Sequence, residues 1–103
     1  MIINLTPHAI VVGDRTIPPS GVVARVASTA RELPPIEGLP VVETAFGETT
    51  GLPPETLGTW LVVSQVVQTA NPGRKDLLRP DTGPESVIRD AEGKILGVKR
   101  LTR

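Results

Sequence analysis

The segment WLVVSQVVQTANPGRKDLLRPDTG, residues 60–83, passes from a strand-like pattern to a helix-like one and then into a charged loop. The run TWLVV, residues 59–63, is typical of a central strand that is buried on both faces. Ser64 is a favoured N-cap residue, so a short helix over 64–71 is expected to begin there. Pro72 ends this helix, because proline cannot continue the hydrogen-bond ladder. The segment therefore predicts a buried strand that runs directly into a helix.

A helix that starts at the end of a strand leaves its first N–H groups pointing outward, where they can bind an anion. The loop after the helix supplies cations, and the planar fork of arginine suits phosphate. Acidic and hydroxyl side chains, Asp81 and Thr82 among them, shape the same loop. The residues expected to bind a ligand here are Ser64, Gln65, Arg74, Asp76 and Arg79. In the plainer alternative, Ser64 only caps the helix and the charged loop is solvated.

The whole chain, residues 1–103, is predicted to be a single compact β-rich α+β domain with six or seven short strands and one or two short helices. Turn signals at Gly13-Asp14 and at Asp90–Gly93 separate β-branched runs and indicate hairpins. The segment 29–40 could start a helical turn before its prolines stop it, and 47–58 reads as a loop.

Composition excludes several classes of protein. Hydrophobic residues make up 39% of the chain and charged residues 21%, which is typical of a globular protein. The absence of cysteine excludes disulfides and thiolate metal sites, and the chain starts without a signal-peptide or membrane-spanning pattern, so a cytoplasmic location is expected. The net charge is zero: residues 1–70 carry three basic and six acidic side chains (−3), and residues 71–103 carry eight and five (+3). This balance argues against a nucleic-acid polymer as partner, but it suits a small anionic ligand. Because no membrane-spanning pattern is present, no membrane partner is expected either.

Two further sites could contribute to ligand binding. The sequence NLTPH places Asn4, Thr6 and His8 around a proline that stiffens the end of the first strand. His8 is the only histidine, and a lone histidine can bind phosphate or act as a general acid or base. Arg25 lies among small apolar residues on a predicted strand, where it could reach an anion or a partner subunit. Each of these residues also has an ordinary structural interpretation.

Standard enzyme signatures are absent from the chain. It contains no G-x-S-x-G, Walker A, H-E-x-x-H or G-x-G-x-x-G motif, and nothing in the spacing supports a triad of Ser64, His8 and Asp81. We therefore assign no catalytic residue, no metal ligand and no cofactor from the sequence.

Several motifs together resemble a set of small phage and bacterial proteins. They are N-L-T-P-H at 4–8, P-P-S-G-x-V-A-R-V at 18–26, G-[LIV]-P-V-V at 38–42, F-G-E…G-L-P at 46–53, V-S-x-x-V-x-x-A followed by R-x-D at 63–76, and D-x-x-G-x-I-x-G-V at 90–98. The resemblance covers nearly the whole chain but implies no settled activity. In size, in the phage origin that the resemblance implies and in its proposed site chemistry, the chain is also similar to phage proteins that sequester the nucleotide signals of bacterial immunity.

The leading hypothesis is accordingly a homo-oligomeric, cytoplasmic phage protein that binds and sequesters a small phosphorylated nucleotide, of the cyclic oligonucleotide or cyclic ADP-ribose type. One alternative is a metal-independent phosphodiesterase or ring nuclease that uses His8 with Arg74 and Arg79. Another is an inhibitor that presents the charged loop to a host protein and binds no small molecule.

Overall fold

The computed structural model describes all 103 residues, of which 48% lie in strands and 6% in one helix. The elements in chain order are β1 (Ile2–Asn4), β2 (Ile10–Val12), β3 (Arg15–Ile17), β4 (Arg25–Ile36), β5 (Leu39–Thr50), β6 (Trp60–Val62), α1 (Gln65–Ala70), β7 (Leu77–Pro80), β8 (Val87–Arg89), β9 (Ile95–Val98) and β10 (Leu101–Thr102). The prediction of a strand-rich fold with little helix is confirmed. The predicted number of strands fits only roughly, because ten form.

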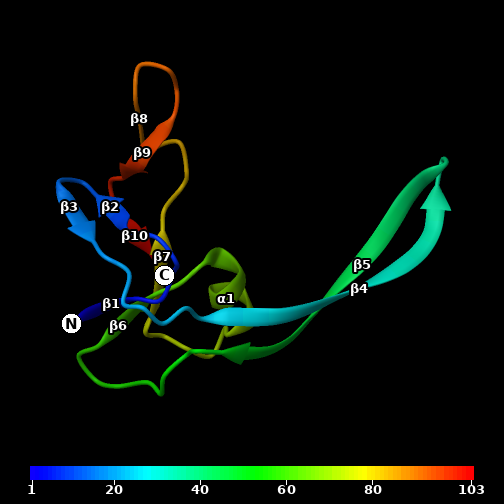
Figure 1. The fold of residues 1–103 in the computed structure, drawn as a ribbon, viewed down its shortest axis with the longest axis horizontal. Coiled ribbons are helices and arrows are strands. Elements are labelled where there is room, and N and C mark those ends of the chain that lie inside the picture. The colour runs from blue at the N-terminus through cyan, green and yellow to red at the C-terminus, as the bar shows by residue number, and fades with distance from the viewer.

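Two mixed four-stranded sheets make the body of the molecule, and a third, two-stranded sheet stands apart from it (Figure 1). The first sheet has the order β1-β6-β7-β10, in which β1, β6 and β7 are parallel and β10 is antiparallel to β7. The second has the order β3-β2-β9-β8. The helix α1 connects the parallel strands β6 and β7, since parallel neighbours need a crossover. The central position predicted for the strand after Thr59 is therefore confirmed.

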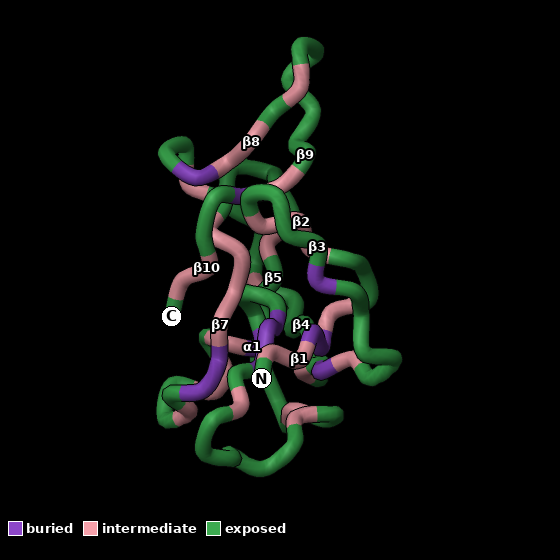
Figure 2. The backbone as a smooth tube through the Cα atoms, turned by 90° about the vertical axis from the view of Figure 1, so that its left-hand side faces the viewer, coloured by how far each residue is buried: buried purple, intermediate pink, exposed green.

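The core is small and lies where β6, β7 and α1 meet (Figure 2). Only 12 of the 103 residues are buried, and the buried apolar cluster holds Leu5, Ala24, Leu61, Val63, Val67 and Leu77. Trp60 differs from the sequence prediction: it begins the central strand, but 38% of its surface is exposed. Trp60 is the first residue of β6, and of residues 60–63 only the three that follow it are fully buried.

Two segments predicted as non-strand are strands in the structure. The segment 29–40 contains no helical turn: β4 runs through Pro34 and Pro35, and β5 starts after a turn at Glu37-Gly38. Prolines are tolerated because β4 has a partner on one side only and the register shifts between Leu33 and Ile36. Residues 47–50, predicted to belong to a loop, extend β5.

The predicted turns at Gly13-Asp14 and Asp90–Gly93 are confirmed, since they connect the antiparallel pairs β2–β3 and β8–β9. Two glycines are fixed by close approach of another strand. A Cβ on Gly51 would overlap the carbonyl of Val23, and one on Gly97 would lie 2.7 Å from the carbonyl oxygen of Val11. Any larger residue at these two positions would force the backbone at Val23 or Val11 to shift.

Candidate functional site

The predicted N-cap at Ser64 is confirmed. Its hydroxyl accepts a hydrogen bond from the N–H of Val67 at 3.3 Å, and its backbone is extended, as an N-cap requires. Asn71 caps the other end of α1 and its side chain also donates to the Val67 carbonyl at 2.8 Å. The helix has only six residues, so it relies on packing through Val67 for its stability. The Ser64 hydroxyl is thus already engaged in capping.

Arg74 and Asp76, both predicted to bind ligand, bind each other. The guanidinium of Arg74 donates from Nε to Oδ1 of Asp76 at 3.0 Å and from Nη2 to Oδ2 at 2.8 Å. Nη2 also donates to the carbonyl of Pro53 at 2.8 Å, and Glu55 lies 3.7 Å from Nε. The Asp76 side chain is only 7% exposed. This bidentate pair therefore fastens the loop 51–59 to the start of β7.

The electrostatics of this pair follow from its geometry. Hydrogen bonds from Arg74 lower the pKa of the Asp76 carboxyl, and burial opposes this only in part. The same bonds raise the pKa of Arg74. Asp81 forms a second pair with Arg100, and this bond, together with one from the Gly83 N–H, lowers the pKa of Asp81.

Stability should therefore decrease in acid. The pKa of Asp76 is lower in the folded chain than its unfolded value of about 3.9, so the unfolded chain binds that proton first. The stabilisation is complete above about pH 4 and is lost as the pH falls toward the lowered folded pKa. Urea unfolding at pH 7, 4 and 3 measures this. In Asp76→Asn, the free energy of unfolding should decrease less between pH 7 and pH 3 than in the wild type. Asp14→Asn, in an exposed turn, should match the wild type. The same pH dependence in all three proteins would contradict the assignment.

The remaining predicted residues of the charged segment lie at the other end of β7. Nε of Arg79 donates to Oε1 of Gln68 at 2.8 Å, and Nε2 of Gln68 donates to the carbonyls of Leu77 and Thr102, each at 3.3 Å. The strand β7 divides the segment. Arg74 and Asp76 lie before this strand, whereas Arg79 lies within it and Asp81 directly after it. The charged segment is consequently not one loop, and its cations are not gathered at the start of α1.

The motif N-L-T-P-H forms a tight hydrogen-bonded turn. Asn4 is 1% exposed; its Nδ2 donates to the carbonyls of His8 at 2.9 Å and Ile17 at 3.1 Å. Its Oδ1 accepts from the Thr6 N–H at 2.9 Å and from the Thr6 hydroxyl at 2.6 Å. Both polar atoms of the Asn4 side chain are therefore hydrogen-bonded, within the turn and to β3, whereas the His8 side chain is exposed.

A shallow hollow of ≈ 210 Å³ at the start of α1 brings together three of the nine predicted residues, Thr6, Arg25 and Ser64. The rest of its lining is apolar and comes from the segments 5–7, 23–26 and 66–67. Gln65, His8, Arg74 and Arg79 do not line it. We call this the helix-start hollow.

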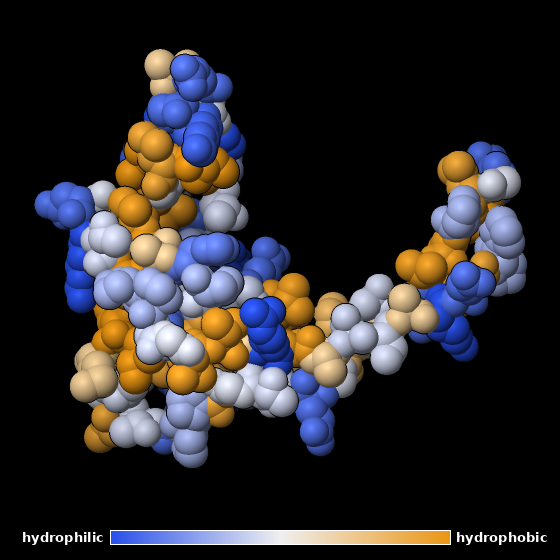
Figure 3. Space-filling model, viewed as in Figure 1, coloured by the Kyte–Doolittle hydropathy of each residue, from blue (hydrophilic) through white to orange (hydrophobic).

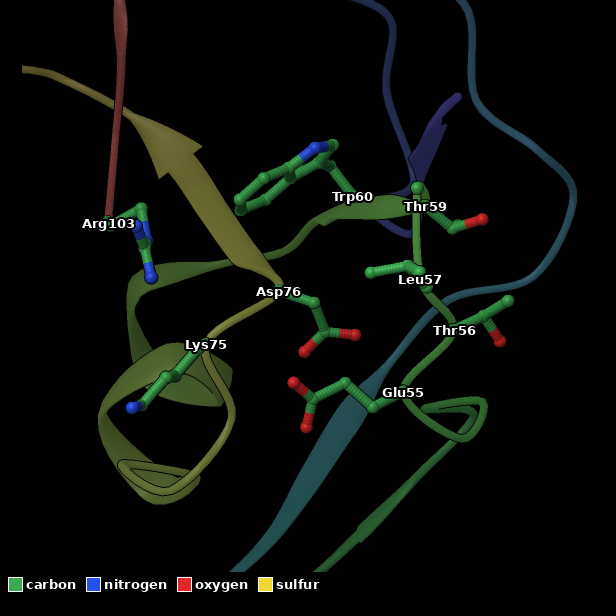
Figure 4. Close-up of a pocket in the computed structure, with 9 residues that line it drawn as sticks. Glu55, Thr56, Leu57, Thr59, Trp60, Lys75, Asp76 and Arg103 are labelled. Carbon is green, nitrogen blue, oxygen red and sulfur yellow. The ribbon is translucent and has the colours of Figure 1, made fainter.

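A second pocket, of ≈ 380 Å³, lies between the loop 55–59, the start of β6, the start of β7 and Arg103 (Figure 4). We call it the Trp60 pocket. The guanidinium carbon of Arg103 lies 5.5 Å from the centroid of the Trp60 ring, within cation–π range. Lys75 and Asp76 line the side opposite the loop, and the carboxylates of Asp76 and Glu55 face each other. Neither Lys75 nor Arg103 forms an ion pair with a side chain.

Of the predicted residues, only Asp76 lines the Trp60 pocket, so sequence reasoning missed most of it. Trp60 and Arg103 lie more than forty residues apart in the chain and meet because β10 pairs with β7, which pairs with β6. The one local signal was the turn Thr56-Leu-Gly-Thr59 immediately before Trp60. Gly58 has φ +83 and the Thr59 N–H donates to the Thr56 carbonyl, as in a type II turn, and Trp60 follows as the first residue of β6.

No helix of the structure combines the length and the apolar character needed to cross a membrane. Comparison with protein-family models, with curated proteins and with solved structures finds no match for this chain. The resemblance to small phage and bacterial proteins, and the function that it implies, accordingly stay hypotheses that rest on the motifs themselves.

Proposed function

We propose that this protein binds a small phosphorylated nucleotide in the Trp60 pocket and, in the phage setting suggested by its motifs, sequesters a host immune signal. The main support is a partly exposed tryptophan with Arg103 over its ring and Lys75 in the lining of the same pocket, two cations that form no ion pair. A base can stack on the indole, and the cations can contact phosphate. Glu55 offers an acceptor to ribose hydroxyls. The volume of ≈ 380 Å³ lies within the usual range for small-molecule sites.

The pocket suits binding better than turnover. His8, the residue on which the phosphodiesterase hypothesis depends, lines neither the Trp60 pocket nor the helix-start hollow. Arg74, which would stabilise a transition state in that hypothesis, already makes a bidentate bond to Asp76 and a bond to Pro53. The phosphodiesterase hypothesis therefore has neither its proposed acid or base nor a free Arg74 in the Trp60 pocket. Denaturing the complex and analysing the released ligand distinguishes the two functions: sequestration returns it intact and cleavage returns fragments.

Trp60 itself provides the test. It is the only tryptophan and the chain has no tyrosine, so intrinsic fluorescence reports this pocket alone. We expect one member of a panel of cyclic di- and trinucleotides and ADP-ribose species to change that fluorescence and to raise the melting temperature. Trp60→Ala should weaken its binding, measured by calorimetry, by roughly 5- to 150-fold, the range for loss of one base–aromatic stack.

Phe46→Ala is the matched control, because Phe46 is the only other aromatic residue and lies on β5, away from the pocket. It should leave the affinity unchanged. A ligand that is lost in Arg25→Ala or Ser64→Ala but kept in Trp60→Ala would place binding at the helix-start hollow and overturn the assignment to the Trp60 pocket. No binding of any panel member at micromolar concentration would overturn the proposed function itself.

A further inference from the structure

The hairpin of β4 and β5 projects from the body as a long arm, residues 28–47, with solvent on both faces (Figures 1 and 3). Apart from Leu33 and Val41, which pair with each other, every residue of the arm is exposed. The radius of gyration is 16.4 Å, whereas a compact domain of this length has about 13 Å. The arm accounts for this elongation.

The end of the arm carries an apolar cluster on one face. In the register of the hairpin, Leu33 lies opposite Val41 and Ile36 opposite Leu39. Opposite residues share a face, and so do Leu39 and Val41, which are two apart on one strand. Ile36 is 62% exposed and Leu39 66%. We call these four residues the tip cluster. The turn that closes it, Glu37-Gly38, has positive φ at both positions, as a type I′ hairpin requires.

An isolated two-stranded hairpin is at best marginally stable in water, so an arm of this length needs a partner surface. The molecule exposes 7296 Å², whereas a compact monomer of 10.9 kDa exposes about 5,600 Å². The excess, about 1,700 Å², is as large as the total area that a standard specific interface buries. Such an interface removes about 800 Å² from each partner, so two contact patches on every chain, one on the arm and one on the body, would bring the exposed surface to that of a compact protein.

The body offers a matching surface. A hollow of ≈ 440 Å³, which we call the apolar hollow, is lined by no charged residue; its lining is Ile3, Leu5, Ser20, Val22, Gly51, Leu52 and Pro53. The arm segment and the rest of the chain also carry net charges of opposite sign. Residues 25–50 carry two basic and four acidic side chains (−2), and the rest of the chain carries nine and seven (+2). The hollow lies at the base of the arm, roughly 35 Å from the tip along β5, so a chain cannot fill its own hollow.

We propose that the tip cluster of one copy of this chain packs into the apolar hollow of a second copy. In a closed assembly each copy donates one arm and receives one, so every tip and every hollow is covered. The proposal does not depend on the nucleotide, because neither surface includes Trp60, Lys75 or Arg103.

Light scattering coupled to size-exclusion chromatography, across micromolar concentrations of the purified chain, tests the assembly. The wild type should be a discrete oligomer. Leu39→Glu and Ile36→Glu should each weaken association by at least 10- to 100-fold, the range for losing one buried aliphatic side chain. Both residues are exposed in the monomer, so these variants should still fold, with unchanged circular dichroism. Leu57→Glu is the matched control: Leu57 is fully exposed on the body, outside both surfaces, and its replacement should leave the oligomer intact.

The absence of native cysteine allows a direct test of the contact. In the double variant Val22→Cys/Leu39→Cys, oxidation should produce covalent oligomers that dithiothreitol dissolves, whereas Leu57→Cys/Leu39→Cys should produce few. A wild type that stays monomeric at 100 µM would overturn the proposal, as would an oligomer that both tip variants leave unchanged. If the arm binds a different protein instead, the purified wild type would stay monomeric.

Discussion

Replacing Asp76 by alanine is expected to lower the free energy of unfolding by about 3 kcal/mol, because the partly buried Arg74 loses its bidentate partner and keeps only the longer ion pair to Glu55, at 3.7 Å. Arg74 would keep its bond to Pro53 but lose both bonds to the carboxylate. A domain of this size has a total stability of roughly 5–15 kcal/mol, so the loss would be easy to see in urea titrations.

A double-mutant cycle separates the pair from its surroundings. Arg74→Ala should destabilise the chain by a similar amount, and Arg74→Ala/Asp76→Ala should cost clearly less than the two single changes together. Glu43→Gln is the matched control, since Arg31 and Glu43 form an equally short pair, at 2.8 Å, that is exposed on the arm. Exposed pairs contribute about 0–1 kcal/mol. If Asp76→Ala proved as mild as Glu43→Gln, the pair would not fasten loop 51–59 to β7.

Local signals in the sequence predicted the parts of the fold that local chemistry determines. The cap at Ser64, the end of the helix at Asn71 and the turns at Gly13-Asp14 and Asp90–Gly93 each depend on residues that are adjacent in the chain. The strand Leu77–Pro80 could not be predicted in this way. Its two leucines stand between charged residues, and it forms because β6 and β10 pair with it on either side.

The arm was missed for a related reason. The prolines at 34 and 35 and the glycines at 38 and 47 read as breaks between short elements, yet β4 and β5 continue through or up to them. An edge position makes the missing proline N–H harmless, and nothing in the local sequence reveals that both strands lack a second neighbour. Sequence patterns indicate burial and turns, but which strands lie at an edge is decided by the whole topology.

The candidate site shows the same limit. Arg74, Asp76 and Arg79 are close in sequence, and their types suggested a phosphate site, but each has found a partner within the fold. The cations that remain without a carboxylate in the Trp60 pocket, Lys75 and Arg103, come from separate segments. A residue's charge can be read from the sequence, whereas its availability to a ligand depends on which partners the fold supplies.

The second large effect is expected at Asn4, where the structure gives a clear alternative to ligand binding. Asn4→Ala removes four hydrogen bonds at a position that is 1% exposed. The buried Ile17 carbonyl and the part-buried Thr6 N–H lose their side-chain partner, while the His8 carbonyl keeps only its bond from the Thr6 hydroxyl. Each unsatisfied buried group costs about 1–3 kcal/mol, so a loss of about 3–5 kcal/mol is expected, enough to unfold a marginally stable chain. Thermal unfolding followed by circular dichroism measures it.

His8→Ala completes this test, because the two residues belong to one motif but differ in their surroundings. The His8 side chain is exposed and makes no hydrogen bond; only its carbonyl serves the turn, and the substitution keeps that carbonyl. The change in stability should therefore stay within about 0.5 kcal/mol. If instead Asn4→Ala folded as stably as the wild type and lost ligand, the motif N-L-T-P-H would be a binding element. If Asn4→Ala is destabilised as expected, the motif N-L-T-P-H is a structural turn that positions β1 beside β6. His8 is then the one polar side chain of the motif that is free to contact a ligand.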